Sequence, residues 1–265
     1  MVSLLQIEWM KLKNYRTFWI LSILYLISIF GINYIVYVIQ QSIYTAKQAK
    51  GMAEMILGTP PYAFPTVWQM TSYVSSFLLF LPGLLIIISI TNEYSFKTHR
   101  QNIIDGWSRK QFISVKLLLT LIAAIISTIM VFLTALFFGM LESNSVSFDR
   151  IYFLGYFFIQ ALSYSMVALL FAILFKRGGL AIGVFFLYVI VLENLLGGLL
   201  NRYANYSGRY LPLESTDNLI PLPVFENVQK QLIQTPNYTA LLIVALVYIV
   251  LYFIFATKKF EADDL

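Results

Sequence analysis

Long uncharged windows divide this chain at regular intervals. They cover residues 17–46, 55–92, 117–141, 151–175, 178–192 and 231–257. All but 178–192 exceed the roughly 20 residues that a helix needs to cross a hydrocarbon core of about 30 Å. The short window is interrupted only by Glu193 and resumes to Asn201. We therefore expect an all-α integral membrane protein, a single transmembrane domain over residues 1–265, with spans near 18–39, 68–91, 116–140, 151–175, 179–200 and 238–257.

The residues before the first span show helical periodicity. Apolar residues recur at three- and four-residue spacing, and polar residues fill the remaining positions. The apolar set is Val2, Leu5, Trp9 and Leu12, and the polar set is Ser3, Gln6, Glu8, Lys11 and Lys13. This pattern predicts an amphipathic helix in the inner membrane interface, with Trp9 at headgroup level. A simple basic anchor for the first span is an equally good interpretation.

Composition agrees with a membrane solvent, since 59% of residues are hydrophobic and 12% are charged. Twelve of the 18 Lys and Arg residues fall on the side that holds both termini in a six-span arrangement. They are Lys11, Lys13, Arg16, Lys97, Arg100, Arg109, Lys110, Lys116, Lys176, Arg177, Lys258 and Lys259. The positive-inside rule then predicts cytoplasmic termini and a cytoplasmic segment 92–116. The pI of about 9.2 therefore reflects membrane topology, and we expect no nucleic acid partner.

Several kinds of chemistry lack the residues they require. The chain has no cysteine, and His99 is its one histidine, so thiolate and multi-histidine metal sites are excluded. No Gly-rich phosphate loop ending in Lys-Ser or Lys-Thr occurs, so we expect no bound cofactor and no ATP hydrolysis by this chain. One membrane acid and one loop histidine cannot build an intramembrane protease. We expect a non-enzyme whose energy source is another polypeptide.

The segment 92–116 has a readable design between the second and third spans. Asn92 and Glu93 favour a helix start, and residues 94–104 can form about three turns. Asp105-Gly106 should end that helix, and Ser108 with Gln111 forms a capping-box pattern that starts the next one. A short helix between two stiff spans suits the transmission of motion.

Residues along this segment carry a family resemblance. They are Glu93, Lys97-Thr98, Arg100 to Ile104, Gly106, Ser108-Arg109 and Lys116. The series resembles the acid, Lys/Gly-Thr, Gly, Ser-Arg and Lys pattern between the second and third spans of ABC-2 type permeases, the membrane subunits of ATP-binding-cassette exporters. The six spans, the N-terminal interfacial helix and the long outer loop before the last span are also similar. A basic loop that only obeys the positive-inside rule is the simpler interpretation.

The resemblance implies a coupling helix that docks on a separate ABC ATPase subunit. It also implies a dimer with a second permease copy or a related permease, contact with membrane lipid, and location in a bacterial inner membrane. Phe96, Ile103 and Ile104 are expected to dock in a groove of the ATPase, with Arg100 and Arg109 meeting acids at its rim. The full set of expected coupling residues is Glu93, Phe96, Lys97, Arg100, Ile103, Ile104, Gly106 and Arg109.

Glu193 is the one ionisable residue well inside a span. An acid at that depth should face protein or a wet cavity, on the export path or at a subunit interface. Alternatively it is hydrogen-bonded to Asn194 of a neighbour or reached by Arg202. A stand-alone secondary transporter is the rival function, and Glu193 would be its only candidate coupling group. Pro82-Gly83 is expected to kink the second span.

Overall fold

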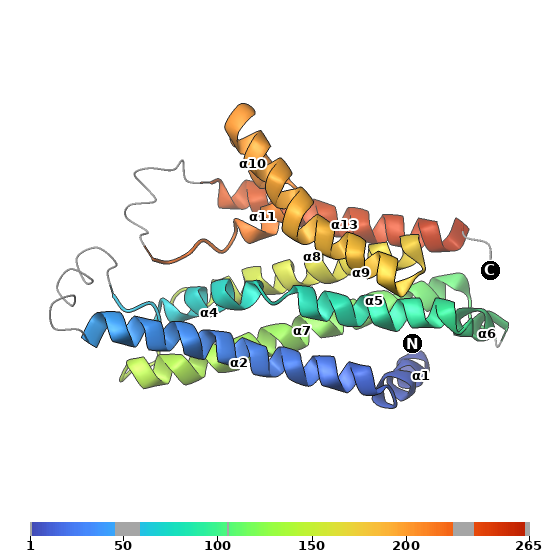
Figure 1. Ribbon diagram of the computed structural model, residues 1–265, viewed down its shortest axis with the longest axis horizontal. Helices are drawn as coiled ribbons and strands as arrows, with labels where there is room; N and C mark the ends of the chain where they lie inside the picture. Colours follow the sequence, from blue (N-terminus) through green and yellow to red (C-terminus); the bar gives the residue numbers. More distant parts are fainter. Residues whose placement is uncertain (1, 46–58, 105, 225–235, 263–265) are drawn as a thin grey trace.

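The chain folds as a bundle of helices that run along one long axis (Figure 1). The structure is a computed structural model and describes residues 2–45, 59–104, 106–224 and 236–262. No strand occurs in those four ranges. The principal helices are α1 (Val2–Lys13), α2 (Arg16–Thr45), α4 (Val67–Ser76), α5 (Phe80–Ser95), α6 (Thr98–Ile104), α7 (Arg109–Glu142), α8 (Tyr152–Phe175), α9 (Gly178–Phe186), α10 (Glu193–Tyr203), α11 (Glu214–Asp217) and α13 (Tyr238–Ala262).

Five helical stretches are long and apolar enough to cross a membrane. They are Arg16–Thr45, Arg109–Glu142, Tyr152–Phe175, Gly178–Tyr203 and Tyr238–Ala262. A sixth crossing results if α4 and α5, which meet at an angle of 45°, form one bent span. The uncharged windows of the sequence thus locate the long helices correctly. The protein is all-helical and has the helices of a membrane protein.

The bend between α4 and α5 lies one turn before the expected place. α4 ends at Ser76 and α5 begins at Phe80, so Pro82 occupies the first turn of α5. Proline is tolerated there because the first helical turn has no acceptor for its missing N–H. The expected kink is confirmed, and the break lies just before Pro82 because a proline ring clashes with the carbonyl four residues earlier.

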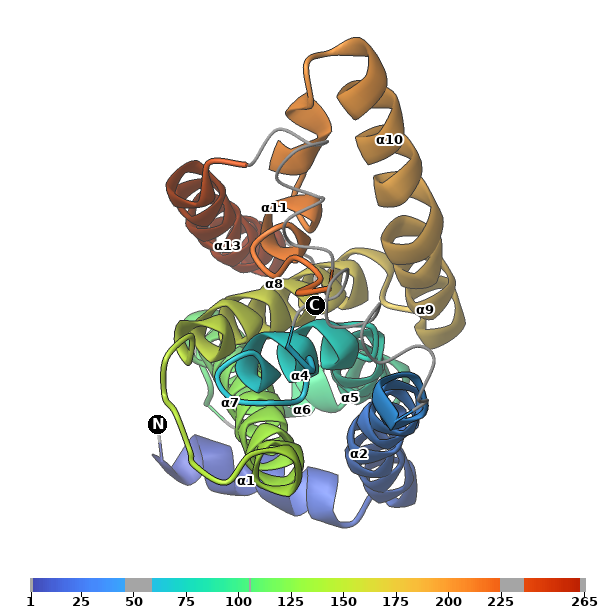
Figure 2. The ribbon, with the colours of Figure 1, turned by 90° about the vertical axis from the view of Figure 1, so that its left-hand side faces the viewer.

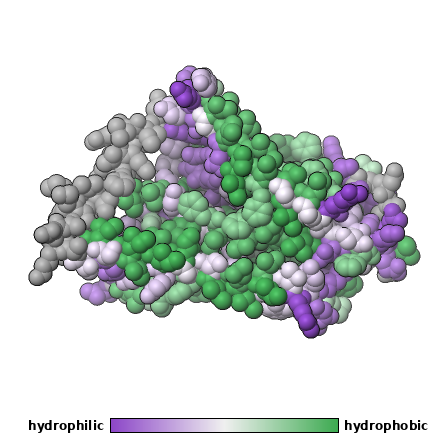
Figure 3. Space-filling view, in the orientation of Figure 1, coloured by the Kyte–Doolittle hydropathy of each residue, from purple (hydrophilic) through white to green (hydrophobic). Residues whose placement is uncertain are grey.

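α8 is the central helix of the bundle. It packs against α4, α5, α7, α9, α11 and α13, and two-thirds of its most apolar stretch is buried. Figure 2 shows α2, α4, α5 and α7 on one side of α8, with α13 and the α9–α10 helix on the other. The outer faces of α2 and α5 are strongly hydrophobic (Figure 3), as expected for helices in contact with lipid.

One end of the bundle gathers the parts that the sequence assigned to a single side. Both chain termini, α6 and the turn between α8 and α9 lie together at that end (Figure 1). At the other end, the helix of α9 and α10 leans away from its neighbours. A six-residue π-helical segment, Leu187–Leu192, joins these two helices directly before Glu193. π-Helical insertions in α-helices occur frequently at functional sites.

Candidate functional site

The connection between α5 and α7 forms the most exposed feature of the end that holds the termini. α5 continues through Asn92 and Glu93 to Ser95, so the expected helix start at these two residues is wrong. The break comes at Lys97, whose backbone adopts a left-handed conformation with φ of 57°. A residue in that conformation cannot continue a right-handed helix, and α6 starts afresh at Thr98.

The exit from α6 follows the sequence prediction. Gly106 has φ of +99°, a conformation that favours glycine. The side-chain oxygen of Ser108 accepts a hydrogen bond from the Gln111 N–H at 3.1 Å, and the Gln111 side chain accepts one from the Ser108 N–H at 2.9 Å. This reciprocal capping box starts α7 at Arg109. Asp105 lies outside the described residues.

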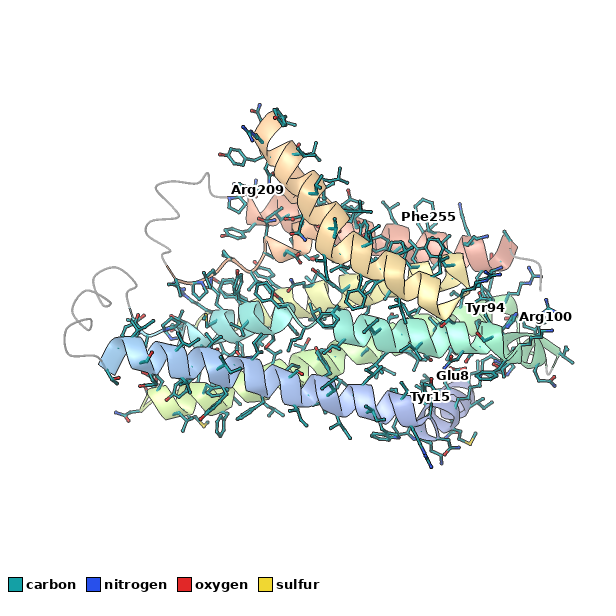
Figure 4. All side chains as sticks on the ribbon, in the orientation of Figure 1. Glu8, Tyr15, Tyr94, Arg100, Arg209 and Phe255 are labelled. Atoms are coloured by element: carbon teal, nitrogen blue, oxygen red, sulfur yellow. The ribbon has the colours of Figure 1, made fainter. Side chains whose placement is uncertain are left out.

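The outer face of this connection combines apolar and basic side chains. Phe96 is 75% exposed and Ile104 is 77% exposed. Lys97 and Arg100 are also exposed, and Arg100 lies beside α6 at the tip of the molecule (Figure 4). Large apolar side chains that lie open beside cations are typical of surfaces that bind a partner.

The inner face of α6 holds the helix firmly in place. His99 and Asn102 are both buried. One ring nitrogen of His99 lies 3.0 Å from the Glu93 carbonyl oxygen, and the ring contacts that of Tyr94 at a centroid distance of 4.7 Å. The Trp107 N–H donates to the Asn102 carbonyl at 3.0 Å. Because the His99 contacts reach back to Glu93 and Tyr94, the inner face of α6 is fixed to the end of α5.

Below α6 lies a set of four ionised side chains, which we call the buried charge cluster: Glu8, Lys11, Glu93 and Lys116. The Lys116 ammonium lies 2.5 Å from Glu8 Oε2 and 2.6 Å from Glu93 Oε1. The Lys11 ammonium lies 2.9 Å from Glu8 Oε1 and 3.2 Å from Glu93 Oε1. Two acids and two lysines balance, so the cluster ties α1, α5 and α7 together without net charge.

Burial and charge oppose each other at the two cluster residues that α1 supplies. Burial alone would raise the pKa of the Glu8 carboxyl, but the ammonium groups of Lys116 and Lys11 outweigh it and hold that pKa below its ordinary value. Burial likewise acts to lower the pKa of Lys11, and the carboxylates of Glu93 and Glu8 raise it above its ordinary value. Both side chains are therefore charged near neutral pH.

The cluster changes the roles that the sequence pattern suggested for several residues. The assignment of Glu8 and Lys11 to an exposed polar face of the first helix is wrong, because Glu8 is buried and Lys11 is half-buried. Glu93 also turns inward, away from the exposed face of α6. The Arg109 guanidinium donates to the backbone carbonyl of Glu261, which connects α7 to the last turn of α13.

Of the three apolar residues expected to form a docking surface, two are exposed to solvent and one is half-buried. Phe96 and Ile104 project to solvent, whereas Ile103 is half-buried. Phe96, Lys97, Arg100 and Ile104 are thus the exposed side chains of this set in the connection from α5 through α6, and we call them the α6 surface. Gly106 is exposed at its edge.

Glu193 packs inside the protein, as the sequence predicted. It is 3% exposed, and its Oε1 atom accepts hydrogen bonds from the backbone N–H groups of Leu213 and, at 3.1 Å, Glu214. Arg202, the expected partner within the same chain, is not among these donors. Glu193 instead anchors the connection between α10 and α13 against α10. Gly208 permits the same close approach, because a Cβ atom added at Gly208 would lie 2.2 Å from the carbonyl oxygen of Gly197 on α10.

Sequence reasoning missed Glu8 and Lys11 as parts of a site, although Lys116 offered a signal. Lys116 lies about two turns inside α7, where a lysine in an apolar helix requires an acid at the same depth. The count of Lys and Arg residues on each side of the membrane included Lys116 only as another cation of a loop. Residues 225–235 of the long loop before the last expected span lie outside the described residues.

Comparison with known proteins places the chain in a family. Residues 33–265 match the family described as "Protein of unknown function (DUF2705)". The chain belongs to the DUF2705 family. No curated protein matches it. The region shared with the DUF2705 family includes α6, Glu93, Lys116 and Glu193, whereas α1, with Glu8 and Lys11, precedes it. Within the described residues, no group of three or more His, Asp or Glu side chains could hold a metal ion.

Proposed function

We propose that this DUF2705 protein is the membrane subunit of an ATP-driven exporter and resembles the ABC-2 type permeases. The observation that carries the proposal is the α6 surface. Exposed Phe96, at the end of α5, and exposed Arg100 and Ile104, on α6, belong to the connection between the long apolar helices α5 and α7. Burying each apolar side chain against a partner is worth roughly 1.5–3 kcal/mol.

In this proposal the chain crosses a bacterial inner membrane six times, with α4 and α5 as one bent span. Both termini and α6 lie in the cytoplasm, as the twelve-to-six distribution of Lys and Arg favours. α1 lies in the inner membrane interface and serves as a coupling element as well as an anchor. Its exposed Trp9 packs edge-on against Phe18 and Trp19, at the start of α2.

The buried charge cluster gives the α6 surface a mechanical role. A partner ATPase that closes on ATP would push on Phe96, Arg100 and Ile104. Because Glu93 and Lys116 pair directly below α6 at 2.6 Å, such a push moves α5 and α7 together. Their rotation, in a dimer of permease subunits, would open the export path. ATP hydrolysis is left to the partner, and no cofactor is expected on this chain.

A stand-alone secondary transporter is the alternative. It would require a membrane-embedded group that gains and loses protons from the transport path. Glu193 is buried and already accepts two backbone hydrogen bonds that hold a loop in place. Its geometry therefore favours a structural role over proton coupling.

Copurification tests the proposal. The tagged chain would be purified from its native membranes in a mild detergent and probed for a copurifying polypeptide with ATPase activity. Phe96→Ala/Ile104→Ala should reduce the amount of copurified ATPase at least tenfold. The control Met140→Ala/Leu141→Ala, at two exposed apolar residues near the other end of α7, should not reduce it. The proposal would be contradicted if no ATPase copurified with the wild-type chain, or if both double variants recovered the same amount of ATPase.

A further inference from the structure

A cavity of about 1060 Å³ lies beneath the leaning helix α10. α4, α8 and the segment that contains α11 form its other walls. Figure 3 shows hydrophilic residues gathered alongside α10 in this part of the molecule, next to the hydrophobic outer face of the same helix. The cavity thus combines a mainly apolar lining with several polar side chains, and its volume is that of a small-molecule site.

Hydrogen-bond acceptors dominate the inner part of this cavity. Asp217 accepts from the Gln160 amide at 2.8 Å and from the Tyr164 hydroxyl at 3.0 Å. The other amide atom of Gln160, Oε1, has no hydrogen-bond partner, although Gln160 is only 2% exposed. Glu214 lines the same cavity. A buried acceptor without a donor is costly, and here two carboxylates accompany it.

Two arginines and several apolar side chains also line the cavity, and the guanidinium of one of them, Arg209, lies 4.6 Å from the centroid of the Tyr206 ring. Arg150 lies just before the first residue of α8, Tyr152, and donates to Gln69 at 3.2 Å. Gln160 lies about 12 Å further along the same helix, at a rise of 1.5 Å per residue. Phe77 and Phe80 line the cavity on the side of α4 and α5. The acidic end is therefore separated along α8 from the rim that contains Arg150.

We infer that this cavity binds an amphiphile that carries a primary ammonium group. Its three N–H donors match Gln160 Oε1 and the carboxylates of Asp217 and Glu214, and its apolar part lies along Phe77 and Phe80. A tyrosine-rich wall favours a cation further through its ring faces. The inference rests on the proposed function only in identifying the ligand as export cargo, because binding itself requires no ATPase.

Fluorescence titration tests the binding with a defined probe. Dansylcadaverine joins an aromatic group to a primary ammonium through five carbons, and N-pentyl dansylamide has the same skeleton without the ammonium. Both would be titrated into the full chain in nanodiscs of uncharged lipid. We expect saturable dansylcadaverine binding at least tenfold tighter than that of the neutral probe.

Variants separate the cavity from general membrane partition. Asp217→Asn and Glu214→Gln should each weaken dansylcadaverine binding at least tenfold, and Ser76→Phe, which fills the cavity, should weaken binding of both probes. Glu142→Gln, which removes an acid outside the lining, should change nothing. Equal affinity for the two probes, or unchanged binding in Glu214→Gln and Ser76→Phe, would overturn the inference. Because the chain is tested alone, a failure to recover an ATPase would not affect this result.

Discussion

At the scale of residues, a single lysine shows how the end of the bundle that holds α1 and α6 is assembled. Lys116 is buried, yet it makes two short ion pairs, with Glu8 on α1 and Glu93 on α5. Charges in such surroundings are tolerated only when each has a partner. The cluster therefore specifies how three helices meet, independently of the apolar contacts around it.

Lys116→Met should destabilise the folded chain by about 3–5 kcal/mol, because it leaves Glu8 and Glu93 with only the half-buried Lys11. Lys116→Met/Glu93→Gln restores the charge balance and should recover most of that loss. Thermal unfolding in detergent, followed by gel filtration, measures the difference. A double variant no more stable than Lys116→Met would show that charge balance is not what holds the cluster.

Asp217, on α11, makes the stability of the folded chain depend on pH. Burial, with the nearby charge of Glu214, raises the pKa of Asp217 from its ordinary value of 3.8 to about 7. Between these values the folded chain holds a proton that the unfolded chain has released, so stability falls as the pH rises from about 4 to about 7.

Asp217→Asn removes this titration and retains an acceptor for Gln160 and Tyr164. The unfolding temperature of Asp217→Asn minus that of wild type should therefore increase from about pH 4 to about pH 7 and stay constant at higher pH. Parallel unfolding curves across this range measure the effect. A constant difference between the two proteins would assign the pH dependence to other groups, of which Glu214 is the nearest acid.

At the scale of elements, the packing of α5 on α9 depends on a glycine. A Cβ atom added at Gly83 would lie 2.6 and 2.8 Å from two ring carbons of Phe185, which is itself fully buried. Gly83→Ala should cost about 1–3 kcal/mol through overpacking. Phe185→Leu in the same chain should recover part of the loss, since the shorter side chain leaves room.

Gly155→Ala is the matched control for Gly83→Ala. Gly155 also lies in a long apolar helix, but nothing stands within 4 Å of its added Cβ atom. Its substitution should leave the unfolding temperature unchanged or slightly raised, because alanine has the higher helix propensity. A loss equal to that of Gly83→Ala would mean that close approach to α9 is not the cause.

The elements themselves were largely predictable, and the site was only partly so. Long apolar windows located the six helical stretches, and Ser108 with Gln111 marked the start of α7, because these signals are local in the sequence. The roles of Glu8, Glu93 and Asp217 depend on partners 23 to 108 residues away. Such pairings follow from how helices pack, which periodicity does not reveal.

At the scale of the whole molecule, the proposal requires that α6 and the outer end of α10 face opposite sides of the membrane. Lys110 and Ala204 are exposed near these two places, and the chain has no cysteine. Lys110→Cys should react with a membrane-impermeant maleimide only after the membrane is permeabilised, whereas Ala204→Cys should react in intact cells. Reaction of both cysteines from the same side would refute the six-span topology.

The central claim is that an ATPase subunit binds the α6 surface, and photocrosslinking tests it most directly. p-Benzoylphenylalanine placed at Ile104 in living cells should give, on irradiation, a covalent adduct between this chain and a nucleotide-binding polypeptide. The same residue placed at Leu141, which is also exposed but lies near the other end of α7, should not. Adducts with lipid alone at both positions, or an identical set of protein adducts from the two, would contradict the account.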